Sequence, residues 1–369
     1  MVAWPGAPTA RLEQEGLPFR SVDAVLGPEG RAAADGAART WARVWGRLPL
    51  ADGRSFRELV EWRGSSLLWS GTSFLLEETA GPRCARTAEV ALRLLEATAA
   101  AEVDAFGLEP SDALLLSRAC TARGVLFHGR VTGPGRPLPV VRPALPSGLR
   151  RLLADALAPA IPPTLPTPAA GAGLGGPILL ALVEGGRDDL APLLEGVSVS
   201  LGQPVVVVGL AELPRWETRR GRRAIRQAEG LLRERLGALA GTPGLAASYA
   251  HRGVAFADLA GGDLEALVLG ALAAAARRIE AARELLAAAR PSAVLLAVDG
   301  RDERRSLVHA CAAEGTSVVV VARGHASGDR ERADGGPQAT AVCEWEPGRD
   351  SSVVAEALGE SARGRVVAG

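Results

Sequence analysis

The stretch "AVLLAVDGRDERRSLVHACAAEGTSVVVVA", residues 293–322, decides the fold class of this protein. Two apolar runs, at 293–298 and 316–322, flank a charged segment with helical spacing that ends at Gly315. Continuous apolar runs of this length are typical of strands that are buried on both faces. A strand, a helix and a second strand in this order predict a parallel pair of strands, and therefore an α/β fold.

The residues upstream extend the same pattern. Apolar runs at 178–183 and 204–210 flank a segment with helical spacing, which predicts a further strand–helix–strand unit. Longer helical patterns follow at 216–239 and 263–289. Together these elements predict a doubly wound parallel sheet in the C-terminal part of the chain.

The N-terminal part repeats this order in a less regular form. With an offset of 191 positions, Cys120 aligns with Cys311 inside matching helix, strand and helix patterns. With a two-residue gap, "EWRGSS" (61–66) also falls on "AHRGVA" (250–255). Because the repeated unit spans much of each half, we predict two related Rossmann-like modules with parallel sheets.

A linker separates the two predicted modules, since 11 of the 25 prolines lie at 131–177. Within it, "GAGLGG" (171–176) has the spacing of a dinucleotide-binding loop, but the apolar strand follows these glycines where it would have to precede them. We therefore do not expect such a loop. The predicted boundaries are an N-terminal module at 1–142, a Pro/Gly-rich linker at 143–176, a second module at 177–330 and the start of a C-terminal domain at 331–369.

The composition argues against several classes of function. All 42 basic residues are arginine and are balanced by 42 acidic residues, so we expect no nucleic-acid partner. Without lysine, a Schiff-base or P-loop lysine is excluded. We see neither a secretion signal nor a transmembrane segment, which predicts a cytoplasmic protein. The four cysteines and four histidines lack the spacing of metal ligands, so we expect no metal site and no bound cofactor.

Candidate binding residues follow the ends of the predicted strands. In an open parallel sheet, ligands bind at the carboxyl ends of the strands, because loops and helix N-termini present polar groups to one crevice there. The second module supplies six candidates and the first module one: Glu184, Asp188, Asp299, Arg301, Arg323 and His325, and His128.

Several polar and aromatic residues also have a simpler structural explanation. Asp302 and Glu303 begin a predicted helix, where acidic side chains offset the helix dipole without any ligand. Asp299 fits either a contact to substrate hydroxyl groups or a cap on the same turn. Trp62 and Trp69 fit either stacking on a sugar or prenyl group or packing in the core, and core packing is the commoner role.

The second module resembles a known family. Its segments "ILLALVEGGRDDLAPLL" (178–194) and "HRGVAF" (251–256), with the stretch quoted first, are similar to the N-terminal half of GT-B glycosyltransferases of bacterial surface polysaccharide synthesis. Capsule polysaccharide and UDP-N-acetylglucosamine 2-epimerase-like proteins share that plan. In such proteins the strand before the interdomain crossing often ends in Gln-His-Gly, whereas this chain has Ala322-Arg323-Gly324 and places His325 one position later. The departure bears on catalytic competence.

The resemblance implies a GT-B-like fold whose second, nucleotide-binding domain is truncated. It implies the acceptor-side half of a glycosyltransferase-like protein, inactive alone, that takes a carbohydrate or lipid-linked sugar as acceptor. A nucleotide sugar would be the donor substrate if the missing domain is supplied. Whether the chain is an enzyme stays open, because two other functions fit: a non-catalytic carbohydrate- or partner-binding scaffold, and a relative of the sugar-nucleotide epimerases.

Overall fold

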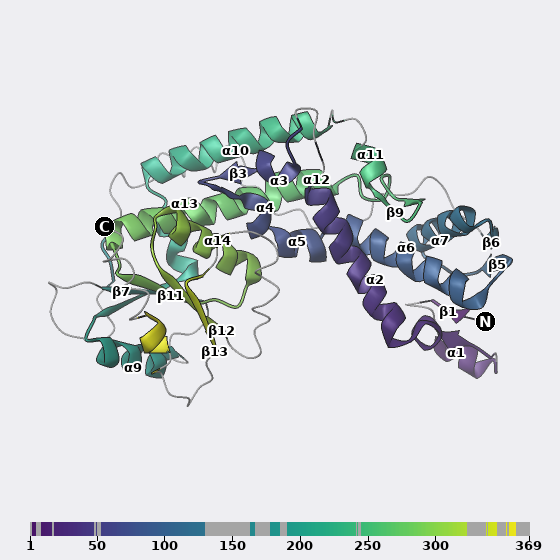
Figure 1. The fold of residues 1–369 in the computed structure, drawn as a ribbon, viewed down its shortest axis with the longest axis horizontal. Coiled ribbons are helices and arrows are strands. Elements are labelled where there is room, and N and C mark those ends of the chain that lie inside the picture. The colour runs from purple at the N-terminus through teal and green to yellow at the C-terminus, as the bar shows by residue number, and fades with distance from the viewer. Residues whose placement is uncertain are drawn as a thin grey trace. The chain divides into compact units, whose positions relative to one another are not determined.

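The computed structural model confirms the α/β class and groups the chain into two units (Figure 1). Unit 1 comprises residues 1–59, 73–143 and 235–268, and unit 2 comprises 60–72, 144–234 and 269–369. Each unit therefore contains a segment from the other half of the chain. The structure describes residues 2–4, 9–16, 18–47, 49, 53–129, 163–166, 178–184, 190–240, 242, 245–322, 337, 339–344, 352 and 354–358.

Unit 2 is built on a five-stranded sheet in which all neighbouring strands are parallel. The spatial order is β13-β12-β11-β7-β8. The three inner strands and β8 are apolar runs without alternation, as expected for strands covered on both faces. The strands are β7 (Leu179–Val183), β8 (Val205–Gly209), β11 (Ala293–Ala297), β12 (Val318–Ala322) and β13 (Ala341–Glu344).

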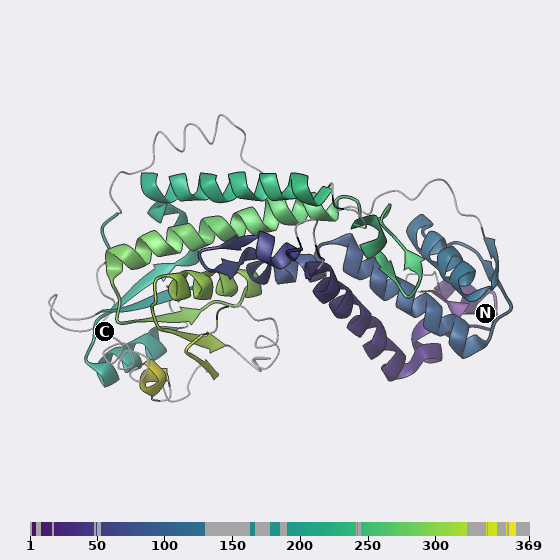
Figure 2. The same ribbon diagram turned by 45° about the horizontal axis from the view of Figure 1, so that its top comes forward.

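Helices cover both faces of this sheet. α9 (Ala191–Leu201) and the helical residues 354–358 pack against one face, where they share a buried cluster with Leu295. α14 (Arg301–Ala313) packs against α13 (Ala273–Ala289). Both lie on the opposite side of the sheet from α9 in the two ribbon views (Figure 1, Figure 2).

The structure differs from the predicted domain boundaries in two ways. β13 pairs with β12 in the same sheet, so residues 341–344 extend unit 2, although the sequence suggested that a new domain starts at 331. The physical reason is that the apolar residues of β13 complete the sheet and Cys343 joins its core. In addition, 60–72 belongs to unit 2 and 235–268 to unit 1. The predicted linker lies mostly outside the described residues, as does "GAGLGG".

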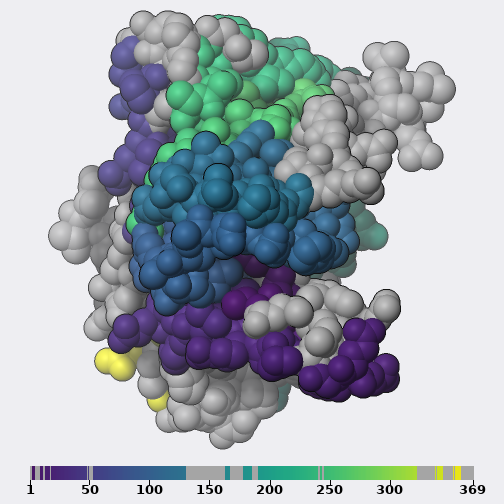
Figure 3. All heavy atoms as spheres, turned by 90° about the vertical axis from the view of Figure 1, so that its right-hand side faces the viewer, coloured from purple at the N-terminus to yellow at the C-terminus, as the bar shows by residue number. Residues whose placement is uncertain are grey.

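Unit 1 combines long helices with a two-stranded parallel sheet. α2 (Val22–Gly46) and α7 (Pro110–Arg123) both pack against α6 (Ala80–Thr98). In Figure 3, the N-terminal residues (purple) lie against the segment that contains α6 and α7 (blue). β5 (Glu102–Ala105) and β6 (Leu126–Gly129) form the sheet, and their residues alternate between half-buried and exposed except at the end of β6. Alternation indicates that one face of this sheet is open.

Aromatic rings fill the core of unit 1. The ring centroids of Trp41 and Trp45 lie 6.0 Å apart, and Tyr249 lies 5.5 Å from Trp41. Phe56 meets Trp45 edge-on at 4.9 Å, and Phe256 lies 5.9 Å from Trp41. Tyr249 and Phe256 come from segment 235–268, so this segment is part of the core and not an attachment to it.

Each unit also contains one short antiparallel hairpin with a two-residue turn. The turn residues are Arg63 (φ 52°) and Gly64 (φ 78°) in unit 2, and Arg252 (φ 47°) and Gly253 (φ 88°) in unit 1. Positive φ at both positions is the geometry of the tight hairpin turns that match strand twist, and glycine adopts it without strain. The hairpin strands are β3 (Glu61–Trp62) with β4 (Ser65–Ser66), and β9 (Ala250–His251) with β10 (Val254–Ala255).

The remaining elements are short or connect the parts above. They are β1 (Val2–Ala3), α1 (Thr9–Gln14), β2 (Arg20–Ser21), α3 (Phe56–Leu59), α4 (Leu67–Ser70), α5 (Thr72–Glu77), η2 (Leu210–Trp216), α10 (Arg219–Ala240), α11 (Leu245–Ser248), α12 (Asp263–Glu265) and η3 (Ala266–Leu272).

Candidate functional site

The candidate site lies where the strand order of the five-stranded sheet reverses. From β7 the chain passes to β8 on one side of it, and later returns to β11 on the other side. Loops that leave two such strands diverge to opposite faces of the sheet and leave a crevice at their carboxyl ends. The residues that follow β7 and β11 therefore define the site.

Glu184 connects these two strand ends. Its backbone N–H donates to the carbonyl of Ala297 at 3.0 Å, which extends the pairing of β7 with β11. Its side-chain Oε2 accepts hydrogen bonds from the backbone N–H groups of Asp299 (2.9 Å) and Gly300 (3.0 Å). The carboxylate thus lies at the backbone turn that starts α14.

The first turn of α14 is built around a close approach. A Cβ on Gly300 would lie 2.4 Å from Oε2 of Glu303, so the position requires glycine unless Glu303 moves. Glu303 in turn accepts a hydrogen bond of 2.9 Å from Nη1 of Arg278 on α13. Asp299 and Arg301 are exposed beside this turn. The site therefore presents carboxylates and one guanidinium on a backbone that is held in place.

The charge of this site selects among ligands. Helix N-termini commonly bind phosphate through backbone N–H groups. Here Glu184 already accepts the two N–H groups that lead into α14, and Asp302 and Glu303 add negative charge in the first turn. A phosphate would have to displace a carboxylate, whereas sugar hydroxyl groups can donate to it. The geometry therefore disfavours a phosphate at this turn.

The structure brings together three of the predicted residues, Glu184, Asp299 and Arg301. Asp188, Arg323 and His325 lie outside the described residues. His128 belongs to unit 1 and is treated separately below.

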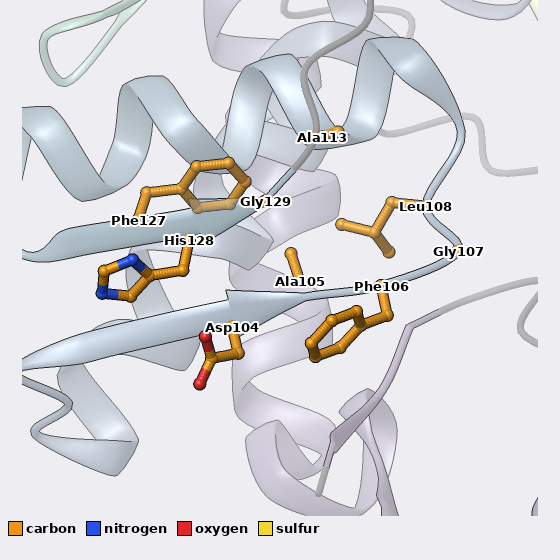
Figure 4. A pocket seen from close by; sticks show the side chains of 9 residues that line it. All are labelled: Asp104, Ala105, Phe106, Gly107, Leu108, Ala113, Phe127, His128 and Gly129. Atoms are coloured by element: carbon orange, nitrogen blue, oxygen red, sulfur yellow. The ribbon is translucent and has the colours of Figure 1, made fainter.

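His128 lines a hollow of about 590 Å³ at the carboxyl ends of β5 and β6 (Figure 4). Asp104, its register partner on β5, and Phe106 extend away from α7, whereas Phe127 extends toward it. Phe106 is 86% exposed. Nε2 of His128 lies 3.5 Å from a carboxylate oxygen of Glu102. Asp104 and Phe106 were missed in the sequence, although their position at a strand end was a usable signal.

The two tryptophans considered as stacking platforms have structural roles. Trp69 is buried on α4, and the guanidinium of Arg305 lies over its ring at 5.5 Å. Nε1 of Trp62 donates to Glu280 at 2.7 Å.

No protein family model, curated protein or solved structure matches this chain. Among the described residues, no group of three or more histidine, cysteine or acidic side chains is placed to hold a metal ion. All four cysteines are buried and free of disulfides. Within the same residues, no helix combines the length and apolar character that a membrane crossing requires.

Proposed function

We propose that this chain is a glycosyltransferase-like protein of bacterial surface polysaccharide assembly, and that a neutral sugar acceptor binds between the ends of β7 and β11. The observation that carries the proposal is the carboxylate of Glu184, hydrogen-bonded to the N–H groups of Asp299 and Gly300 at the reversal point of the sheet. It supports an acceptor site over a nucleotide site, because it occupies donors that a diphosphate would use.

The class of the protein rests on the resemblance to GT-B enzymes, with which the parallel sheet is compatible. Under this proposal the chain supplies the acceptor side, and a nucleotide sugar is bound by a separate nucleotide-binding domain. Glycosyl transfer requires donor and acceptor to be held together, and this positioning contributes roughly 7 to 11 kcal/mol to lowering the barrier. We therefore expect binding by this chain without transfer.

Nuclear magnetic resonance of the ¹⁵N-labelled chain tests the location. The amide signals of Asp299 and Gly300 report directly on the Glu184 hydrogen bonds. Titration with neutral disaccharides should shift both signals in a saturable manner, and UDP should shift them less. Shifts confined to β5 and β6 would contradict the proposal.

Substitution of Glu184 sharpens this test. Glu184→Ala removes the carboxylate and leaves the two N–H groups to other acceptors, so sugar affinity should fall and UDP or inorganic phosphate affinity should rise. Loss of one carboxylate hydrogen bond corresponds to roughly a tenfold change in affinity. Glu102→Gln, an exposed carboxylate of unit 1, is the matched control and should change neither. A fall in both affinities would show that Glu184 only maintains the fold.

A donor screen tests whether the chain transfers sugar by itself. The purified chain is incubated with UDP-, GDP- and CMP-sugars and the disaccharides, and sugar transfer and nucleotide release are measured. Sugar binding without release agrees with an acceptor-side protein or a non-catalytic scaffold. Release above that of an Asp299→Asn, Arg323→Ala variant would contradict the acceptor-side assignment.

A further inference from the structure

The two hairpins are held by the same kind of contact, in different units. In unit 2, Oε1 of Glu280 on α13 accepts hydrogen bonds from Nε1 of Trp62 (2.7 Å) and Nε of Arg63 (2.9 Å). Arg283, on the same helix, donates to Glu280 at 3.1 Å. Glu280 is 2% exposed, so the hairpin covers this carboxylate and, together with Arg283, compensates its charge.

The hairpin of unit 1 repeats this arrangement on α6. Oε2 of Glu89 lies 2.8 Å from Nε2 of His251 and accepts from Nη1 of Arg252 at 3.1 Å. Arg93, on the same helix, donates to Glu89 at 2.6 Å. Glu89 is 4% exposed. Arg252 also donates to Glu96 at 2.8 Å.

A residue of the second helix also contacts each hairpin, on the first strand in unit 2 and on the second strand in unit 1. In unit 2, Nε2 of His309 on α14 donates to the carbonyl oxygen of Trp62 at 2.8 Å. In unit 1, Nη1 of Arg118 on α7 donates to the carbonyl oxygen of Ala255 at 2.7 Å. Arg118 also forms two hydrogen bonds, of 2.8 and 2.9 Å, with the carboxylate of Asp258.

Backbone geometry follows the same correspondence. Among the described residues other than glycine, positive φ occurs at Arg63, Ala99, Arg252 and Arg290. Ala99 and Arg290 end α6 and α13, and they stand 191 positions apart. Glu89 and Glu280 are separated by the same interval. Strained positions that recur in pairs indicate one structural plan used twice.

We propose that the N-terminal half (residues 2–129) and the C-terminal half (178–358) are binding partners that exchange hairpins, and that their association does not depend on the peptide connection between them. Each half supplies the arginine turn that neutralises the buried glutamate on a helix of the other half. Aromatic packing adds to this, because Tyr249 and Phe256 contact Trp41. Separating the halves would expose these rings and remove the hairpin donors of Glu89 and Glu280, which would keep only Arg93 and Arg283.

Cleavage of the intact, folded chain tests the proposal. A protease site is placed near residue 145, the purified protein is cut, and the products are followed by size-exclusion chromatography with mass detection. The fragments should elute together at the mass of the uncut chain, and urea should separate them in one transition. Separate elution of folded or aggregated fragments in native buffer would overturn the proposal.

Exchanging the charges of one ion pair between the fragments distinguishes weaker association from a folding defect, because a double variant can restore the pair. Arg118 and Asp258 are on different fragments, and their side chains are 30% and 41% exposed. Arg118→Asp and Asp258→Arg should each lower the urea concentration at which the fragments separate, and the double variant should restore it. Arg86→Asp is the matched control, because its partner Asp35 is on the same fragment. Equal effects of Arg86→Asp and Arg118→Asp, or no rescue in the double variant, would also overturn the proposal.

Discussion

The strand pair β5–β6 of unit 1 and the pair β11–β12 of unit 2 follow the same order of helix, strand, helix and strand, but they differ on one face. In unit 2 that face carries Leu295 and Val319, which are buried in the cluster that includes α9. In unit 1 the corresponding residues are Asp104 and His128, which are exposed. The same backbone plan therefore forms the interior of one unit and the surface of the other, depending on a few side chains.

The largest expected effect comes from exchanging these side chains. Leu295→Asp places an unpaired carboxylate in a dry core and removes a buried leucine, so it should cost about 5 kcal/mol or more and prevent folding. Asp104→Leu should change the free energy of unfolding by about 0.5 kcal/mol or less. Urea unfolding followed by circular dichroism measures both. Effects of similar size would show that the face of β5–β6 is covered.

The two buried glutamates should behave alike. Glu280→Ala removes the carboxylate that Arg63 contacts, and Glu89→Ala leaves Arg252 with Glu96 alone. We expect losses of about 3 kcal/mol for each, because breaking a buried ion pair leaves uncompensated groups. Burial by itself raises the pKa of Glu89, but hydrogen bonds from His251, Arg93 and Arg252 hold it below its usual value.

The stabilisation from Glu89 is therefore present above pH about 4.5 and is lost as the pH falls through the lowered native pKa. Urea midpoints of both variants between pH 3 and 7 provide the measurement. A large loss for one variant and none for the other would contradict the correspondence of the two hairpins.

Asp263, in unit 1, should make stability depend on pH with the sign opposite to that of Glu89. Its carboxylate accepts hydrogen bonds from the N–H groups of Ala80 and Gly81, yet burial raises its pKa from 3.8 to about 6. Between these values the native state binds a proton that the unfolded state has lost, so stability falls as the pH rises.

The stability of Asp263→Asn relative to the unsubstituted chain should therefore increase by about 2 kcal/mol from pH 4 to pH 6. Asp258→Asn is the control, because the hydrogen bond from Arg118 lowers the pKa of Asp258. Its relative stability should change little from pH 4 to pH 6, and the reversed trend should appear only below pH about 4. Parallel trends for the two variants would refute this assignment.

The smallest effect is expected on the open face of unit 1. Glu102 and His128 are 65% and 54% exposed, and ion pairs in water contribute little. Glu102→Gln should change the free energy of unfolding by less than about 0.5 kcal/mol. Thermal unfolding at low and high salt measures it. A loss above about 1 kcal/mol would indicate that this face is less hydrated than the exposures suggest.

The sequence was sufficient to predict the elements of unit 2. Its strands are continuous apolar runs and its helices have clear spacing, so local pattern and tertiary environment agree. The predicted positions of the strand ends also indicated that Glu184, Asp299 and Arg301 lie at one edge of the sheet. The hydrogen bonds of Glu184 were not predictable, because they depend on how two loops distant in sequence meet.

The assignment of segments to units could not be predicted for a similar reason. Alignment of "EWRGSS" with "AHRGVA" showed that the two segments correspond, but alignment carries no information on which helix each hairpin contacts. Contacts such as Arg63 with Glu280 span more than 200 positions. A residue pair of opposite charge is common in any sequence, so it does not indicate a contact without the fold.

The position of Tyr249 and Phe256 has a consequence for protein synthesis. Trp41 and Trp45 leave the ribosome early and Phe56 follows soon after, but Tyr249 and Phe256 are translated more than 200 residues later than Trp41. At the usual rates of translation this delay lasts roughly 10 to 40 s. During that interval Trp41 lacks the two rings of segment 235–268 that cover it in the folded protein, so the nascent N-terminal half exposes apolar surface that favours association with other chains.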